Sequence, residues 1–172
     1  MNVSEVLNAW GTEPRASAQR LMEQYGEPDE ISKSMLIWRD TPDGWKRTEL
    51  SDEPTLHKFP AEHNDFLKQV IDYKVPIGMF STLAAFDGSI GADRTRGEMS
   101  ARCGGTSMNL VAINLAHDII TGRRSVDLAR REYTRVYKAY QDGERPEYTQ
   151  SFQFEFPFGD TKDPDVVTLN GD

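Results

Sequence analysis

The chain has 172 residues, with 20 lysines and arginines against 28 aspartates and glutamates, so its net charge at pH 7 is −8. This length allows one domain with its own hydrophobic core, and 37% hydrophobic residues are typical of a globular protein rather than a disordered one. The acidic excess argues against nucleic acid as a general partner, because that affinity depends on cationic contacts to phosphates.

The sequence contains one cysteine, Cys103, so it can form no internal disulfide. Its first residues lack the basic and apolar segments of a signal peptide, and no stretch approaches the roughly 18 apolar residues of a membrane helix. We therefore expect a cytoplasmic protein that has no contact with a membrane.

Two short helices are predicted at the amino terminus. Asn2 and Glu5 have the spacing of a capping box, and the helix that they begin should end before Gly11. Thr12 caps a second helix, which should end before Gly26. We expect these helices to form an amino-terminal arm.

A β-hairpin is predicted next. Residues 34–38 and 45–50 are short segments rich in apolar and bulky side chains. Between them, Thr41-Pro-Asp-Gly44 has proline and glycine at positions that favour a tight turn.

Residues 62–73 are predicted to form a helix, because four apolar residues recur at the spacing of a buried helical stripe: Phe66, Leu67, Val70 and Ile71. On that helix, His63 and Asp65 would point about 200° apart, since successive residues are about 100° apart. The helix would therefore separate these two side chains.

The middle of the chain predicts a short helix over 77–84 and an extended region over 89–103, with a turn or bulge near residues 94–97. Two longer helices are predicted over 106–121 and 125–141, and the short link between them should make them antiparallel.

The segment around residues 148–157 predicts a strand, because Phe152, Phe154 and Phe156 alternate with polar residues. We therefore expect one α+β domain over residues 1–157. It would consist of an antiparallel sheet of about four strands, two long antiparallel helices and a short helical amino-terminal arm. Residues 158–172 should form an acidic tail that contains glycine and proline.

His57, His63 and Asp65 are a candidate metal site, because imidazole and carboxylate ligands suit zinc or a similar ion. His117 and Asp118 could complete it. However, the spacing of the two histidines matches no common zinc motif, and Pro60 lies between them. In the alternative interpretation, His63 begins a helix and His57 is a loop residue with a backbone partner.

Cys103 is a candidate nucleophile, because Gly104-Gly-Thr-Ser107 follows it at the start of a predicted helix, where a thiolate would be stabilised. Either His63 or His117 could act as its base. The segment resembles in outline the phosphate loop of cysteine phosphatases, but Asn109 stands where that family has an arginine, so we do not expect phosphatase activity. Alternatively, Cys103 is a small buried apolar residue.

A charged run is the third candidate site: Arg94, Arg96, Glu98 and Arg102. Guanidinium groups bind carboxylates or phosphates well, so the run could hold an anionic ligand. It could equally consist of ion pairs across an edge of the sheet.

The common nucleotide, zinc-protease and serine-hydrolase motifs do not occur in the sequence, and we expect no cofactor. The first hypothesis for function is therefore a non-catalytic binding domain that associates with a partner protein, which could be basic, or with itself. The alternative is a small hydrolase-type enzyme that uses Cys103 as nucleophile or a metal held by His57, His63 and His117. Convergence of these side chains in one cleft would favour the enzyme.

Overall fold

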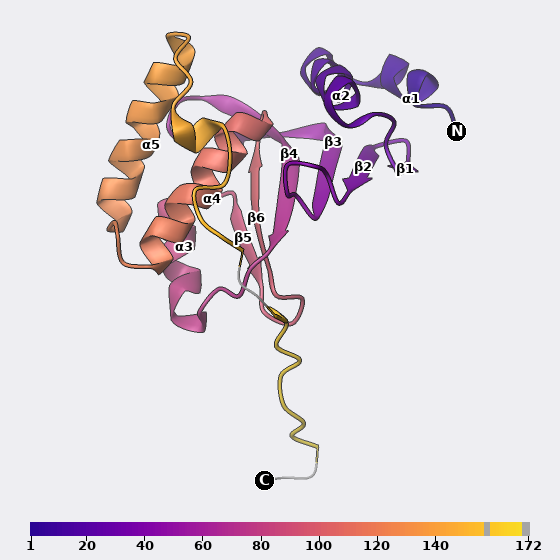
Figure 1. The fold of residues 1–172 in the computed structure, drawn as a ribbon. Helices are drawn as coiled ribbons and strands as arrows, with labels where there is room; N and C mark the ends of the chain where they lie inside the picture. The colour runs from indigo at the N-terminus through magenta and orange to yellow at the C-terminus, as the bar shows by residue number, and fades with distance from the viewer. Residues whose placement is uncertain (157–158, 170–172) are drawn as a thin grey trace.

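Six antiparallel strands form the sheet in a computed structural model that describes residues 1–156 and 159–169 (Figure 1). Their spatial order is β1-β2-β3-β4-β6-β5, so β4 and β3 lie at the centre. The strands are β1 (Glu30–Ile31), β2 (Met35–Arg39), β3 (Arg47–His57), β4 (His63–Asp72), β5 (Ile90–Asp93) and β6 (Glu98–Cys103).

The helices fall into two groups along the chain. The amino-terminal group is α1 (Val3–Ala9) and α2 (Thr12–Tyr25), and the other is α3 (Phe80–Phe86), α4 (Thr106–Ile120) and α5 (Val126–Gln141). Short 3-10 turns, η1 (Ile77–Met79) and η2 (Glu147–Thr149), precede α3 and follow α5. Within the described residues, none of the helices has the length and apolar character needed to cross a bilayer.

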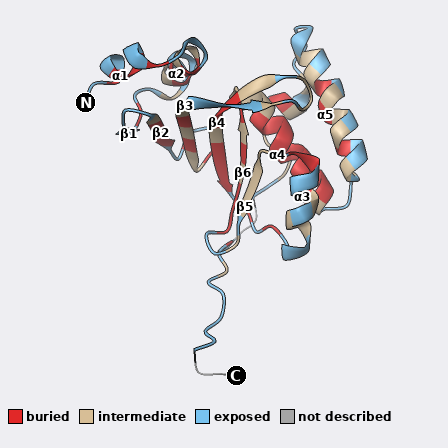
Figure 2. Ribbon diagram, turned by 180° about the vertical axis from the view of Figure 1, so that it is seen from behind, coloured by how far each residue is buried: buried red, intermediate tan, exposed pale blue. Residues whose placement is uncertain are grey.

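Both helix groups pack on one face of the sheet. Leu67 belongs to the hydrophobic cluster beneath α1 and α2, whereas Ile71 belongs to the cluster beneath α3, α4 and α5. These residues are four apart on β4, so they point to the same face. Buried residues accordingly concentrate on α4 and the central strands (Figure 2).

The α+β class is confirmed, as are the two amino-terminal helices, the hairpin of β2 and β3, and the long helices α4 and α5. The turn expected near residues 94–97 joins β5 to β6. The sheet has six strands in the described residues rather than about four, because β1, β4 and β5 also pair.

The helix predicted over residues 62–73 is wrong, because this segment is strand β4. It lies between β3 and β6, and both Leu67 and its neighbour Phe66 are buried. Consecutive residues of β4 are buried although the helices pack on one face only, and such an apolar run can imitate the stripe of a helix. Pairing with two neighbouring strands therefore decided the local structure.

The strand predicted over residues 148–157 is also wrong for its described part, residues 148–156. Phe152 and Phe154 pack against the core cluster, but their backbone joins no strand. Asn114 on α4 instead donates hydrogen bonds to the carbonyls of Tyr148 and Ser151. A helix side chain thus satisfies backbone groups that a strand partner would otherwise bind.

Residues 159–169 are an extended segment that leaves the body of the molecule (Figure 1). The Thr161 hydroxyl donates a hydrogen bond of 2.8 Å to the carbonyl of Gly97, and the Asp163 amide donates one of 3.1 Å to the carbonyl of Arg94. The turn between β5 and β6 therefore holds the first part of this segment.

Candidate thiol and imidazole site

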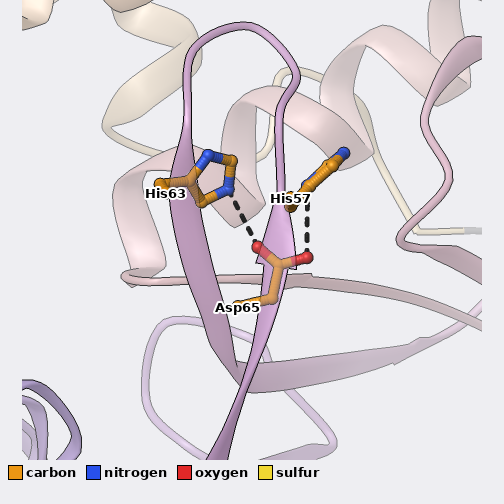
Figure 3. Close-up of side chains that lie close together, drawn as sticks. All are labelled: His57, His63 and Asp65. Atoms are coloured by element: carbon orange, nitrogen blue, oxygen red, sulfur yellow. Dashed lines mark hydrogen bonds and ion pairs between the residues drawn. The ribbon is translucent and has the colours of Figure 1, made fainter.

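His57 and His63 are directly paired across the β3–β4 hairpin, and Asp65 lies two residues further along β4. Successive side chains of a strand alternate between faces, so His63 and Asp65 share one face. The carboxylate of Asp65 lies between the two imidazole rings (Figure 3). The strand therefore assembles the three side chains that were predicted as a metal site.

The side chain of Asp65 is fully buried, and its carboxylate is surrounded by polar partners. Its Oδ1 lies 2.9 Å from Nε2 of His63, and its Oδ2 lies 3.1 Å from Nδ1 of His57. Ser89 donates a short hydrogen bond to the same carboxylate, and Nε of Arg102 lies 3.9 Å away. Burial by itself would raise the pKa of Asp65, but the hydrogen bonds from His63 and Ser89 outweigh it and lower that pKa.

The partners of both ring nitrogens of His63 favour its doubly protonated form. Its Nδ1 lies 2.8 Å from the carbonyl of Ala61, which can only accept a hydrogen bond. Its Nε2 faces both the Asp65 carboxylate and Sγ of Cys103, at 3.6 Å. The hydrogen bond to Asp65, followed by the one to Cys103, raises the pKa of His63 to about 11.

Cys103 ends strand β6, and only 6% of its surface is exposed. A cysteine nucleophile needs an imidazole within reach, and His63 occupies that position, with Nε2 3.6 Å from Sγ. Gly105 precedes α4 and gives the helix no side-chain cap. The first N–H groups of α4 therefore remain available to a negatively charged group near Cys103.

A cavity of about 460 Å³ adjoins the thiol. Its walls come from α2, from the segment between β6 and α4, and from α5. Cys103 and His63 both line it, together with Leu21, Met108 and Tyr137. A small molecule in this cavity would contact the sulfur and the imidazole together.

The side of His57 that faces away from Asp65 approaches a second buried carboxylate. Nε2 of His57 lies 3.6 Å from Oδ1 of Asp87, which follows α3. Burial raises the pKa of Asp87, although the backbone amide of Ser89 donates a hydrogen bond to it and opposes that shift. Sequence patterns did not single out Asp87 or Ser89, because a turn after a helix carries no signal of chemistry.

The ligand atoms of His57, His63 and Asp65 all lie within 4.8 Å of one another. Two imidazoles and a carboxylate suit zinc, and Cys103, whose Sγ lies 3.6 Å from the same Nε2 of His63 that faces Asp65, could add a thiolate. The residue types and their closeness therefore fit a divalent ion as well as thiol chemistry.

His117 lies elsewhere, so His63 rather than His117 reaches the thiol. Nδ1 of His117 is 2.8 Å from the hydroxyl of Tyr73, and its ring stacks on Phe154 at 4.2 Å. Burial lowers the pKa of His117, so the ring is held neutral. Asp118 binds Arg124 and Tyr148 and contributes nothing to the group around Cys103.

The charged run is spread over several ion pairs. Arg94 binds Asp163 and Asp165 of the carboxyl-terminal segment, and Arg96 pairs with Asp93. Glu98 contacts Lys46 and Arg47, and Arg102 approaches Asp65. Each guanidinium of the run thus faces a carboxylate of the chain itself, but the partners of Arg94 and Arg96 lie in the carboxyl-terminal segment and at the end of β5 rather than across an edge of the sheet.

No known protein family matches this chain, and neither the curated proteins nor the solved structures that were compared with it contain a similar one.

Proposed function

We propose that the protein is a small thiol-dependent enzyme of the hydrolase type, with Cys103 as nucleophile and His63 as its acid and base. The observation that carries this proposal is the distance of 3.6 Å between Sγ and Nε2 at the wall of a cavity. A thiol and an imidazole within hydrogen-bonding reach are the arrangement that activates a cysteine nucleophile. The closeness of Cys103, His63 and His57 supports the enzyme hypothesis, although His117, which was expected to join them, contacts Tyr73 and Phe154 instead.

The proposed reaction is acyl transfer to sulfur followed by hydrolysis. The thiolate of Cys103 attacks the carbonyl carbon of an ester or amide, so a C–S bond forms. The imidazolium of His63 protonates the leaving group as the C–O or C–N bond breaks. Neutral His63 then takes a proton from water, and the resulting hydroxide attacks the thioester and releases the carboxylic acid and the thiolate.

Asp65 serves as the positioning residue for His63. In the common triads the carboxylate binds the imidazole nitrogen that faces away from the nucleophile. Here the carbonyl of Ala61 binds that nitrogen, Nδ1, and Asp65 shares Nε2 with the thiol. Asp65 therefore stabilises the imidazolium and must release Nε2 when His63 acts as a base.

A panel of nitrophenyl esters and nitroanilides tests the proposal. Cys103→Ala should abolish turnover, and His63→Asn should lower it by at least about a hundredfold. His117→Asn separates the two candidate bases, because its ring binds Tyr73 and should leave the rate as it is in the unaltered protein. Turnover that survives Cys103→Ala would refute the proposed nucleophile.

A metal centre is the second candidate, supported by the mutual closeness of the ligand atoms of His57, His63 and Asp65. Titration with zinc followed by measurement of bound metal tests it. Zinc should bind stoichiometrically to the unaltered protein and not to His57→Gln, whereas His117→Gln is the matched control and should still bind it. Zinc binding no greater than background would end this candidate.

The hypothesis of a partner protein or of self-association rests on the net charge of −8. Salt-dependent capture of basic proteins, and the mass in solution, are its tests. A cytoplasmic location fits the thiol chemistry, because Cys103 must stay reduced to act as a nucleophile. The partner protein and the cytoplasmic location are therefore predictions in addition to the proposed activity.

A further inference from the structure

We infer that the cavity beside Cys103 selects a small acyl substrate with an aromatic or apolar body and one anionic group, and that Arg20 binds this group. This inference rests on the proposed function only in calling the ligand a substrate. The binding of an anion beside the thiol does not depend on it. Three features of the cavity carry it: its charge, its unpaired arginine and its aromatic wall.

The cavity lacks carboxylates in a chain that is rich in them. The chain has 28 aspartates and glutamates, yet no described residue that lines this cavity is acidic. Arg20 and His63 are its cationic lining residues. Because Asp65 already balances the charge of His63, the guanidinium of Arg20 is the free positive charge at this site.

Arg20 lies on the face of α2 that borders the cavity. Ser17, Leu21 and Gln24 line the cavity too, and their spacing along the helix places them on one side with Arg20. Within the described part of the chain, the guanidinium of Arg20 makes no hydrogen bond or ion pair, and its backbone belongs to α2. An exposed guanidinium without a carboxylate partner can bind an incoming carboxylate or phosphate in a bidentate way.

The opposite wall of the cavity is aromatic. Tyr133, Tyr137 and Tyr140 lie on one stripe of α5, at the three- and four-residue spacing of a helix face. Aromatic rings offer flat apolar surface with a polar tip, which suits a ring or a short acyl chain. A volume of about 460 Å³ accommodates a ligand of that size.

A pair of alkylating reagents tests the anion site without requiring any hydrolysis. Iodoacetate and iodoacetamide react alike: the thiolate displaces iodide, a C–S bond forms and the C–I bond breaks. They differ in charge, and Cys103 is the sole cysteine of the chain, so the rate of mass gain reports one residue. The measured quantity is the ratio of the iodoacetate rate to the iodoacetamide rate.

Arg20→Gln should lower this ratio about fivefold, as expected when one exposed ion pair is lost. Arg131→Gln is the matched control: Arg131 lies on α5, is exposed, and does not line the cavity. It removes the same charge and should leave the ratio unchanged. Arg20→Lys should keep part of the preference. Equal ratios in the unaltered protein, Arg20→Gln and Arg131→Gln would overturn the inference.

Competition then identifies the class of anion. Benzoate or phenyl phosphate should slow the reaction of Cys103 with iodoacetamide in the unaltered protein. Both should slow it less in Arg20→Gln. Neutral benzyl alcohol should slow the reaction in the unaltered protein less than either anion does. If benzoate protects more strongly, the preferred anionic group is a carboxylate. If phenyl phosphate protects more strongly, it is a phosphate. Protection by benzyl alcohol as strong as by both anions would count against an anion site.

Hydrolysis separates the two proposals. Nitrophenyl hydrogen glutarate, an anionic ester, should be hydrolysed with a higher kcat/KM than neutral nitrophenyl butyrate, and Arg20→Gln should lower this preference about fivefold. A changed alkylation ratio without any ester turnover would keep the anion site and reject the hydrolase. Turnover that depends on Cys103 but shows no charge preference would keep the hydrolase and reject the anion site.

Discussion

His63 and Asp65 lie two residues apart on strand β4, with imidazole Nε2 2.9 Å from carboxylate Oδ1. The pairing of β4 with β6 ends at Leu67 and Cys103, and beyond this point Sγ of Cys103 lies 3.6 Å from Nε2 of the same histidine. One strand and its neighbour thus bring a buried carboxylate and a thiol to the same nitrogen of one imidazole.

Replacement of this carboxylate should change how stability depends on pH. Because the pKa of His63 is raised from 6.5 to about 11, its contribution to the free energy of unfolding is fully present below pH 6.5 and is lost as pH rises towards 11. In Asp65→Asn that pKa should fall, so this alkaline loss should shrink. Urea unfolding at a series of pH values measures it.

Asp142→Asn is the control for this series, because Asp142 is exposed and follows α5, far along the chain from the site. This variant should lose stability at alkaline pH to the same extent as the unaltered protein. If Asp65→Asn and Asp142→Asn gave parallel curves, the charge pair of His63 and Asp65 would contribute no pH dependence.

The opposite dependence is expected at His117, whose pKa is lowered by burial. The unfolded chain then binds a proton more readily than the folded protein, so stability should fall as pH decreases below about 6.5. His117→Asn removes this titration but also the stacking on Phe154. We expect a less stable protein whose unfolding free energy varies less between neutral and mildly acidic pH, and a slope equal to that of the unaltered protein would contradict the expectation.

Asn109 should be structural, although it stands near the candidate nucleophile. It is fully buried, and its Nδ2 donates to the carbonyl of Leu67 at 3.1 Å and to Oε1 of Gln69 at 3.0 Å. Asn109→Ala leaves both acceptors buried without this donor, so it should destabilise the protein by about 1–3 kcal/mol. Asn8→Ala, at an exposed position of α1, should change stability far less. Chemical denaturation compares the two variants.

Gly97 should be needed for docking of the carboxyl-terminal segment. Its φ of +62° is unfavourable for other residues, and an added Cβ would lie 2.3 Å from the backbone of Thr161. Gly97→Ala should therefore cost about 1–3 kcal/mol and speed hydrogen exchange in residues 161–165. Gly78→Ala has open space around it and is the matched control. Unchanged exchange in Gly97→Ala would show that this contact does not hold the segment.

The parts of the fold that local patterns predict are those in which periodicity and caps agree. Ser125 accepts a hydrogen bond from the amide of Leu128 at the start of α5, and the side chain of Asn2 likewise caps α1. Strand β4 was missed because its apolar run, buried on both faces, has no period of two. The segment with Phe152 and Phe154 is wrongly predicted as a strand for the opposite reason. Its alternation is regular, but Asn114 binds its backbone in place of a neighbouring strand.

The wrong prediction of a helix over residues 62–73 also obscured the candidate site. As helix residues, His63 and Asp65 would point about 200° apart, whereas as strand residues they share a face. His57, His63, Asp65 and Cys103 could be nominated from their chemistry alone, but the choice of His63 over His117 as partner of the thiol required the sheet. Arg20 gave no signal, because an arginine on an exposed helix face is ordinary.

By itself the sequence determined the α+β class, the caps of α1 and α5, the hairpin of β2 and β3 and the small set of side chains that can carry chemistry, whereas the cap predicted at Thr12 is wrong, because Gly11 precedes α2 without a side-chain cap. These depend on contacts within a few residues, which the order of side chains encodes directly. Only the tertiary structure decided which reactive groups meet, because His63 and Cys103 are 40 residues apart in the chain and are joined by the pairing of β4 with β6. That pairing joins segments that are distant in the chain, so it is a property of the whole sheet that local patterns do not encode.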